Sequence, residues 1–344
     1  MCSPWGTGGR TERAVMPEHQ RPAIAVMNTL LTEMVAPLAE AFDLRFPGCE
    51  TQGQDEAVIA IVGVGTDRIS AALMDRYPRL RLIASPSAGV DGVDLAAASA
   101  RGIGVTSGAG INAPDVAAHA VGLALAARTG LFAGDAFVRS GAWQTSRPQP
   151  RRSIAADKVG IVGLGAIGGR VAASLAPLCE AVAWFGPRAK DAPWPRKPSL
   201  RYLAVWADIL VLCARGGADT RGMIGADEIA AIGPDGLFVN VARGYMVDEQ
   251  ALRAALMTGA LGGAALDVFE REPCPPDLWQ DVPNCMLSPH RGGSTSRTAE
   301  LAGELVRANL RALLSGAPLR NQVMPDPAKS TSERCVACGT SGEP

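Results

Sequence analysis

The sequence predicts an α/β protein made of two doubly wound domains with parallel sheets, and three observations support this fold class. Short apolar runs alternate with helical stretches along most of the 344 residues. The composition is 47% hydrophobic but only 5% aromatic, as expected where Ala-rich helices pack closely on parallel sheets. One apolar run leads directly into a glycine-rich turn and an Ala-rich helix. A chain of this length is too long for one small core, so we expect two domains.

The first third of the chain alternates predicted strands and predicted helices. Such alternation implies right-handed β-α-β units around a parallel sheet. The predicted strands are Ala23–Met27, Val58–Val62, Leu80–Ala84 and Gly104–Thr106, and the predicted helices are Thr32–Phe42, Asp67–Tyr77 and Leu95–Ala100.

A second series of units follows a long helix and a polar loop. Pro114 opens this helix, which runs to Arg128 with Asn112 as its expected N-cap. The loop 140–153 is rich in Gly, Pro, Arg and Gln. An amphipathic helix, Thr298–Ser315, closes the series. The predicted strands between them are Val159–Val162, Ala181–Phe185, Ile209–Cys213, Leu237–Val241, Gly263–Val268 and Met286–Leu287.

The strand 159–162 leads into G-x-G-x-x-G, and we expect a helix over 170–177 after it. Gly163 permits a tight turn, Gly165 lets the backbone approach phosphates, and Gly168 brings helix and strand together. Free N–H groups at the helix start then hold the negative charge. Ala166 and Ile167, within the glycine turn, are also expected to contact the cofactor. Gly occurs 39 times, so the motif alone is weak evidence. The strand before it and the helix after it favour a bound dinucleotide over a plain glycine turn.

The predicted organisation is a dinucleotide-binding domain inserted into a substrate-binding domain, both Rossmann-like or flavodoxin-like. The last helix is expected to pack on the first domain. Residues 112–290 form the dinucleotide-binding domain, and residues 22–111 with 291–323 form the substrate-binding domain. Residues 1–21 and 324–344 are expected to be disordered tails, and Met16 is a candidate for the true start.

Charge and cysteine content exclude several classes of function. The net charge of −1 gives no electrostatic reason to expect nucleic acid or an anionic membrane as partner. No apolar run reaches the roughly 20 residues that span a bilayer, and the N-terminus lacks a secretory signal. We therefore expect a cytoplasmic protein without a disulfide framework. Cys335 and Cys338 form one CxxC, which is too little for a zinc site, so we expect no metal and favour an unstructured tail.

Three later segments carry candidate catalytic residues. Arg243 directly follows a strand end, where open α/β sheets bind ligands. Glu272 lies in an acidic segment after the next strand, and His290 lies between Pro289 and two glycines. Taken singly, these residues would be a surface ion-pair Arg, a solvated carboxylate and a structural His.

Together with the glycine turn, these segments resemble the D-isomer-specific 2-hydroxyacid dehydrogenase family over roughly residues 22–323. The pattern is nearest to the glyoxylate and hydroxypyruvate reductases of that family. Segments 80–91 and 110–117 also resemble it. The matching motifs are G-L-G-x-I-G, A-R-G-x-x-V-D-E, L-D-V-F-E-x-E-P and P-H-x-G-G-S-T.

The resemblance implies hydride transfer between a nicotinamide dinucleotide and a small 2-keto or D-2-hydroxy acid. It implies that Arg243 grips the substrate carboxylate, and that His290 is the general acid-base, with its pKa raised by Glu272. Backbone N–H groups of Ala88 and Gly89 would also hold the carboxylate. It further implies a homodimer through the dinucleotide-binding domain. The remaining expected cofactor contacts are Ala214, Thr220, Ala242, Asp267 and Gly292.

The end of the strand 181–185 favours NADP(H) over NAD(H), although NAD(H) stays open. NAD enzymes place an acidic residue there on the ribose 2′-OH, but this chain has Gly186. Arg188, and with it Lys190, would attract a 2′-phosphate. The alternative is a solvated basic loop.

Other functions also remain open at this stage. A phosphoglycerate dehydrogenase-like enzyme, or one acting on phosphonates or other 2-hydroxy acids, would use the same residues. A nicotinamide-sensing binding protein of the corepressor type is the alternative from another class. His119 is interpreted as a core or linker histidine, with altered contacts near the hinge as the alternative. Arg291 adds a cation beside His290 that would favour a second acidic group on the substrate.

Overall fold

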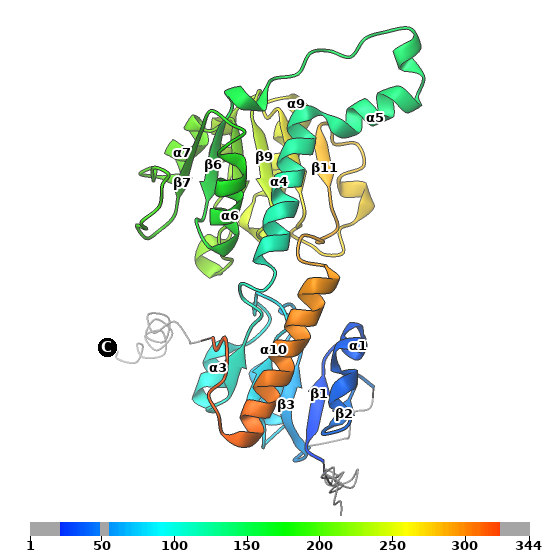
Figure 1. Ribbon diagram of the computed structural model, residues 1–344, viewed down its shortest axis with the longest axis vertical. Coiled ribbons are helices and arrows are strands. Elements are labelled where there is room, and N and C mark those ends of the chain that lie inside the picture. The colour runs from blue at the N-terminus through cyan, green and yellow to red at the C-terminus, as the bar shows by residue number, and fades with distance from the viewer. Residues whose placement is uncertain (1–20, 49–54, 324–344) are drawn as a thin grey trace, which may run out of the picture. The chain divides into compact units, whose positions relative to one another are not determined.

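The computed structural model describes residues 21–48 and 55–323, and it confirms the predicted α/β class with two parallel sheets. The described chain forms two compact units: in Figure 1 the first is blue to cyan together with the orange to red C-terminal part, and the second runs from blue-green through green and yellow to orange. The first unit contains the described residues up to Gly108 and those from Ala302 onward. The second unit is Ala109–Leu301.

The first unit is a five-stranded parallel sheet in the order β2-β1-β3-β4-β5. Apolar residues from η2, α1, η3 and α10 (Ser296–Ser315) pack on one face of this sheet. Those from α2 and α3 pack on the other. The strands are β1 (Ala23–Val26), β2 (Asp43–Arg45), β3 (Val58–Val62), β4 (Leu82–Ala84) and β5 (Gly104–Thr106), and the short helices are η2 (Thr29–Leu31), α1 (Thr32–Val35), η3 (Ala36–Leu38), α2 (Ala71–Asp75) and α3 (Leu95–Ala100).

The second unit is a six-stranded parallel sheet in the order β11-β10-β9-β8-β6-β7. Helices α4 and α6 cover one face, and α7, α8 and α9 cover the other (Figure 1). The strands are β6 (Lys158–Val162), β7 (Ala181–Phe185), β8 (Ile209–Leu212), β9 (Leu237–Asn240), β10 (Gly263–Leu266) and β11 (Cys285–Leu287), and the helices are α4 (Ala113–Thr129), α5 (Leu131–Arg139), α6 (Ala166–Leu175), α7 (Leu200–Trp206), α8 (Ala226–Ile232) and α9 (Glu249–Thr258).

In each sheet the first strand of the unit lies between the second and the third. In the second unit this strand is β6, which has β7 on one side and β8 on the other. The connections leaving β6 and β8 therefore run in opposite directions across the sheet. Open parallel sheets bind ligands beyond the strand ends at such a reversal. The glycine turn, which directly follows β6, occupies this position.

Several predicted elements were wrong in extent. The helix predicted over 32–42 is reduced to α1 and η3, with η2 directly before them, and Pro37, which has no backbone N–H, lies in η3 just after the break. The helix predicted over 67–77 is reduced to α2, because Ser70 caps it with its side chain. The helix predicted over 170–177 begins four residues earlier, at Ala166. Strand β2 was missed, since its three residues are only half buried.

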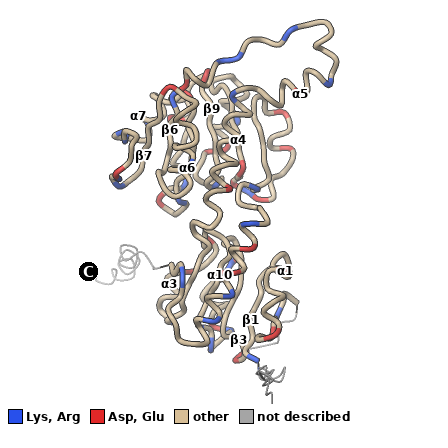
Figure 2. Tube along the Cα trace, viewed as in Figure 1, with Lys and Arg blue, Asp and Glu red and all other residues tan. Residues whose placement is uncertain are grey.

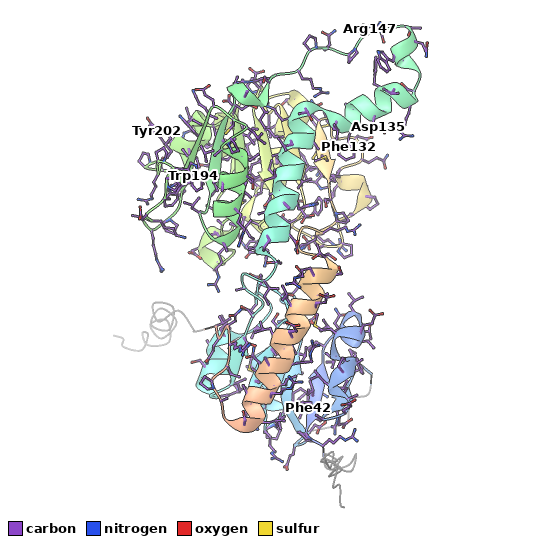
Figure 3. All side chains as sticks on the ribbon, viewed as in Figure 1. Phe42, Phe132, Asp135, Arg147, Trp194 and Tyr202 are labelled. Atoms are coloured by element: carbon purple, nitrogen blue, oxygen red, sulfur yellow. The ribbon has the colours of Figure 1, made fainter. Side chains whose placement is uncertain are left out.

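The segment after α4 also differs from the prediction. Gly130 ends α4 in the left-handed conformation, with φ of 65°, and α5 follows at once. No side chain of α5 is buried, and Leu131 and Phe132 are each 65% exposed. Phe132 and Asp135 are labelled on α5 in Figure 3. Asn112 holds the predicted N-cap position of α4, but its side chain makes no capping hydrogen bond.

Acidic and basic residues are interspersed along the described trace (Figure 2). Within that trace, no single helix is both long and apolar enough to cross a membrane, and α4 and α5 reach that criterion only as a pair bent by 55°. The four cysteines that the structure describes, at 179, 213, 274 and 285, are free thiols. The predicted tails, Met16 and the Cys335–Cys338 pair lie outside the described residues.

A buried ion pair joins the end of α4 to the start of β6. Arg128 donates from Nε and Nη2 to the two carboxylate oxygens of Asp157, at 2.5 and 2.6 Å. The Asp157 side chain is completely buried, and Arg152 Nε is 2.9 Å from its Oδ1. Removing one partner of a buried pair leaves an uncompensated charge, which is strongly destabilising.

We therefore expect Arg128→Met to lower the free energy of unfolding by about 3 kcal/mol, near the lower end of the usual range because Arg152 remains. Urea denaturation measures this change. The matched control is Arg139→Met, which removes the 2.8 Å pair with Asp135 from a site where the side chains are 77% and 58% exposed. That change should cost less than about 1 kcal/mol. Equal losses in the two variants would contradict the role assigned to Asp157.

Candidate active site

The glycine turn after β6 has the shape of a phosphate cradle. Gly163 has φ of +92°, and a Cβ there would lie 2.5 Å from Ala214 Cα. A Cβ on Gly168 would lie 2.1 Å from the carbonyl oxygen of Gly163, so α6 can approach β6 closely only with glycine at this position. Gly165 instead faces open space, and no side chain caps α6 at this residue. The first N–H groups of α6, including those of Ala166 and Ile167, thus border an open space that suits a dinucleotide pyrophosphate.

Three of the cations on the segment that leaves β7 are candidates for binding a phosphate. Lys190 Nζ donates to the carbonyl oxygen of Leu164 inside the glycine turn, at 2.6 Å. Arg196 donates from Nε and Nη2 to the carbonyl oxygen of Gly186, at 3.0 and 2.7 Å. Arg188, which precedes both in sequence, is exposed. None of the ion pairs between described residues involves these three side chains, so their charge is not neutralised by carboxylates of the described chain.

Arg196 is held in place by an irregular extension of the sheet. The segment around Trp194, labelled in Figure 3, returns along β7 and forms a parallel bridge between Trp184 and Arg196. Trp184 Nε1 donates to the carbonyl oxygen of Trp194, at 3.0 Å. The guanidinium of Arg196 also lies 5.9 Å from the centre of the Trp184 ring. A fixed cation therefore stands at the end of β7, beside the position where an acid was missing from the sequence.

His290 and Glu272 form a hydrogen-bonded pair, with Nδ1 2.6 Å from Oε2. This bond raises the pKa of His290 above its ordinary value, while burial and the charge of Arg243 oppose the rise. Burial raises the pKa of Glu272, but the hydrogen bonds from His290 and from the Phe269 N–H outweigh it and hold the pKa below its usual value. The pair therefore favours a protonated imidazole beside an ionised carboxylate. His290 Nε2 is left to act on a ligand.

The loop that carries His290 is anchored by Asp267, which directly follows β10 and is almost completely buried. The backbone carbonyl of Asp267 accepts from the His290 N–H at 2.8 Å. Its Oδ1 accepts from the Arg291 N–H and its Oδ2 from the Gly292 N–H, both at 2.8 Å. His290 has φ of 52°, a left-handed conformation that is uncommon without glycine. Three consecutive N–H groups bound to one residue stabilise this conformation.

Arg243 is positioned by the end of β9. Asn240 is buried; its Nδ2 donates to the carbonyl oxygen of Arg243 at 3.1 Å, and its Oδ1 accepts from the Ala242 N–H at 3.0 Å. A Cβ on Gly244 would lie 1.8 Å from the carbonyl carbon of Phe269, so only glycine permits this approach. The loops after β9 and β10 therefore pack together. Arg243 lies near enough for its charge to lower the pKa values of both His290 and Glu272.

The structure thus brings most of the predicted site residues to one edge of the second sheet. Ala214 lies against the glycine turn, and Ala242, Asp267 and Gly292 surround the loops of Arg243 and His290. The hydroxyl of Thr220 bonds to the backbone of Gly217, 2.9 Å from both its N and its O. Ala88 and Gly89 belong to the first unit, where they follow β4 and are half buried. Gly89 packs against Gly65.

Sequence reasoning missed four residues that organise this edge. Asn240 was not among the predicted site residues, although a buried Asn at a strand end indicates a loop held by side-chain hydrogen bonds. Arg196 lies ten residues beyond Gly186, farther along the chain than the predicted phosphate ligands Arg188 and Lys190. Ser288 and the helical His119 have no local signal, because their contact joins residues 169 positions apart.

A dinucleotide cradle and a His–Glu pair with a nearby Arg, all at one edge of a parallel sheet, define a nicotinamide-dependent oxidoreductase of the acid-base type. The sequence profile of the D-isomer specific 2-hydroxyacid dehydrogenase, NAD binding domain, matches residues 121–292. The chain belongs to this family, and it is therefore an NAD(P)-dependent D-2-hydroxyacid dehydrogenase.

Relatives with different substrates resemble the chain over nearly its whole length. It is 34% identical to a 2-ketogluconate reductase of Gluconobacter oxydans over 308 residues, covering 88% of this chain and 99% of the relative. It is 32% identical to a glyoxylate/hydroxypyruvate reductase of Arabidopsis thaliana, covering 92% and 99%. Among solved structures, the NADPH-dependent glyoxylate/hydroxypyruvate reductase of Sinorhizobium meliloti, in complex with NADP and malonate, has a TM-score of 0.81 at 32% identity, covering 88% and 97%.

The His290–Glu272 bond makes a prediction about titration. Because the folded pKa of His290 is raised, the pair contributes stability that is complete below the ordinary His pKa of about 6.5 and is lost as the pH rises through the raised value. Glu272→Gln removes the carboxylate charge, so we expect the pKa of His290 to fall. The chain has only three histidines, so ring-proton NMR can follow each one. An unchanged His290 titration in this variant would be evidence against the pair.

Proposed function

We propose that the protein reduces a small 2-keto acid to the D-2-hydroxy acid with NADP(H) as its preferred cofactor, and that glyoxylate or hydroxypyruvate is the substrate. The observation that carries this proposal is the His290–Glu272 pair beside Arg243. The reductase names of the relatives in Arabidopsis and Sinorhizobium support the choice of substrate. The 2-ketogluconate reductase shows that the same scaffold also takes a longer keto acid.

The residues divide the chemistry between them. Bound NADPH would supply the hydride that reaches the carbonyl carbon. His290, protonated with the help of Glu272, donates its Nε2 proton to the carbonyl oxygen of the substrate. Arg243 binds the carboxylate and that oxygen with its planar guanidinium. In the oxidation direction, neutral His290 takes the hydroxyl proton. The N–H groups of Ala88 and Gly89 are further carboxylate ligands that we propose.

The function is tested by a panel of 2-keto acids with NADPH and NADH in parallel. The panel includes glyoxylate, hydroxypyruvate, 2-ketogluconate and a 2-keto acid with a second carboxylate, because Arg291 adds a cation beside His290. For the best substrate, we expect His290→Ala to lower kcat by a factor of about 10²–10⁴, the usual contribution of general acid catalysis.

NADPH affinity is the control for His290→Ala, because no contact of the glycine turn involves this side chain. Fluorescence titration should give nearly the same Kd for the variant and the parent. Near-normal turnover in the variant would contradict the role of His290. A parent that binds NADPH but reduces no keto acid would instead favour a nicotinamide-sensing binding protein.

We propose the preference for NADP(H) from the composition of the β7 loop. A 2′-phosphate at Gly186 meets no carboxylate side chain at that position, whereas an NAD enzyme needs one for the ribose hydroxyls. Arg188 is exposed and forms no ion pair with a described residue, so its guanidinium can bind a phosphate through two N–H groups. Lys190 and Arg196 add positive charge from fixed positions on the backbone.

Arg188→Asp should reverse this preference. A charge-assisted hydrogen bond is worth roughly 1.5–3 kcal/mol, so NADPH affinity should fall by about 10- to 100-fold. NADH affinity should rise, because the new carboxylate can accept from the ribose 2′-OH. Titration of the same variant with both cofactors gives the ratio of Kd values directly. A ratio equal to that of the parent would show that Arg188 does not hold the phosphate.

We further propose that the protein is a homodimer through its dinucleotide-binding unit. The support is α5, which buries none of its own side chains within the chain. Leu131, Phe132 and Val138 on this helix are 65%, 65% and 53% exposed. Exposed apolar side chains gathered on one element are typical of a subunit interface.

A further inference from the structure

His119 lies on α4, in the second unit, and its ring reaches the base of the catalytic loop. Its Nε2 is 3.0 Å from Ser288 Oγ and 3.2 Å from Asp267 Oδ1. The side chain is 29% exposed. Ser288 and Asp267, the two residues next to the ring, therefore belong to the hydrogen-bond network that holds the His290 loop. His119 itself lies in none of the motifs that indicated the function.

The direction of these hydrogen bonds follows from the number of protons. Ser288 has one hydroxyl proton, and its Oγ lies 2.7 Å from Asp267 Oδ1. The carboxylate of Asp267 also accepts from the N–H groups of Arg291 and Gly292, so Ser288 donates its proton to it. Ser288 Oγ must then accept from His119, which carries a proton on Nε2. The order of donation is His119 to Ser288 to Asp267.

The same helix holds the far side of the loop. Asp115, one turn before His119, accepts from Thr295 Oγ1 at 2.7 Å and from Thr298 Oγ1 at 2.8 Å. A Cβ on Gly292 would lie 3.4 Å from His119 Cδ2, so the loop packs closely against the imidazole. The loop between Ser288 and Thr298 is thus tied to α4 at both ends, and His290 lies between the ties.

We propose that His119 is a positioning residue for the general acid His290, acting through Ser288 and Asp267. Ser288 and the Arg291 N–H donate to Asp267 Oδ1, with His119 Nε2 close beside it, and these contacts fix the direction of that oxygen. Asp267 in turn fixes three consecutive N–H groups of the loop. Because His290 has a left-handed backbone, a small rotation of Asp267 would release the loop toward a conformation with negative φ. The imidazole would then turn away from Glu272. This inference rests on the proposed function of His290.

The test compares His119→Leu with His119→Gln. Leucine removes the donor, whereas the glutamine side chain can place an amide N–H near the position of Nε2. Below the unfolding transition, we expect kcat to fall about tenfold in His119→Leu, which corresponds to about 1.4 kcal/mol, with KM and the Kd of NADPH nearly unchanged. His119→Gln should restore most of kcat. A loss of kcat below twofold in His119→Leu, or the absence of rescue by glutamine, would overturn the proposal.

Ser288→Ala provides a second variant that does not depend on the folding of His119→Leu. It removes the intermediate hydroxyl and should cost a similar factor in kcat. If His119 acts through Ser288, the double variant His119→Leu/Ser288→Ala should be no slower than the slower single variant. Losses that multiply in the double variant would show that His119 acts by another route, and would overturn the proposal.

A measurement without substrate separates this inference from the proposed function. Amide hydrogen exchange of Arg291 and Gly292 should become faster in His119→Leu and should return toward the parent rate in His119→Gln. Unchanged exchange would refute the positioning role even if the enzyme reduces a keto acid. Faster exchange in a protein that reduces none of the panel would instead leave the positioning role standing and refute the reductase.

Discussion

The loop that carries His290, at one edge of the second sheet, depends on the hydrogen bonds that one buried residue, Asp267, accepts. Its carbonyl and carboxylate oxygens accept from three consecutive N–H groups of the loop that carries His290, and from the hydroxyl of Ser288. A buried carboxylate is costly unless it is fully hydrogen-bonded, and here several donors meet that requirement. The same bonds hold His290 in a left-handed backbone conformation. One set of contacts therefore satisfies the buried charge and also orients the imidazole that we propose as the general acid.

The electrostatics of the site show which effect dominates around His290. Burial and the charge of Arg243 both disfavour the imidazolium, yet the pKa of His290 is raised. The direct bond to Glu272 is the largest influence, since the two atoms are only 2.6 Å apart. Arg243, which we propose as a substrate ligand, can therefore lie close to His290 without discharging the proposed general acid. Glu272 remains ionised, because the hydrogen bonds from His290 and from the Phe269 N–H lower its pKa.

Features with a local signal could be predicted from the sequence, and features made by distant contacts could not. The strand over 159–162 and the turn at Gly163 are specified by adjacent residues, so both were found. The helix α5 was missed because none of its side chains is buried. A helix is predicted from the periodic apolar residues that face the core, and α5 does not face one. The contact between His119 and Ser288 spans 169 residues. It follows from how α4 packs against β10 and β11, which depends on the assembled sheet.

The segment after β7 also depends on contacts that the local sequence does not indicate. In this segment, backbone carbonyl groups hold cations near a position that lacks an acidic side chain. Gly186 offers no acid to a ribose, but its carbonyl oxygen receives two N–H groups of Arg196. Lys190 similarly binds the carbonyl oxygen of Leu164. A cation bound to a carbonyl oxygen keeps its full charge, whereas one paired with a carboxylate would be neutralised. Backbone carbonyls thus fix two positive charges beside the glycine turn without cancelling them. Arg188, which forms no ion pair with a described residue, is the third cation of the phosphate site that we propose.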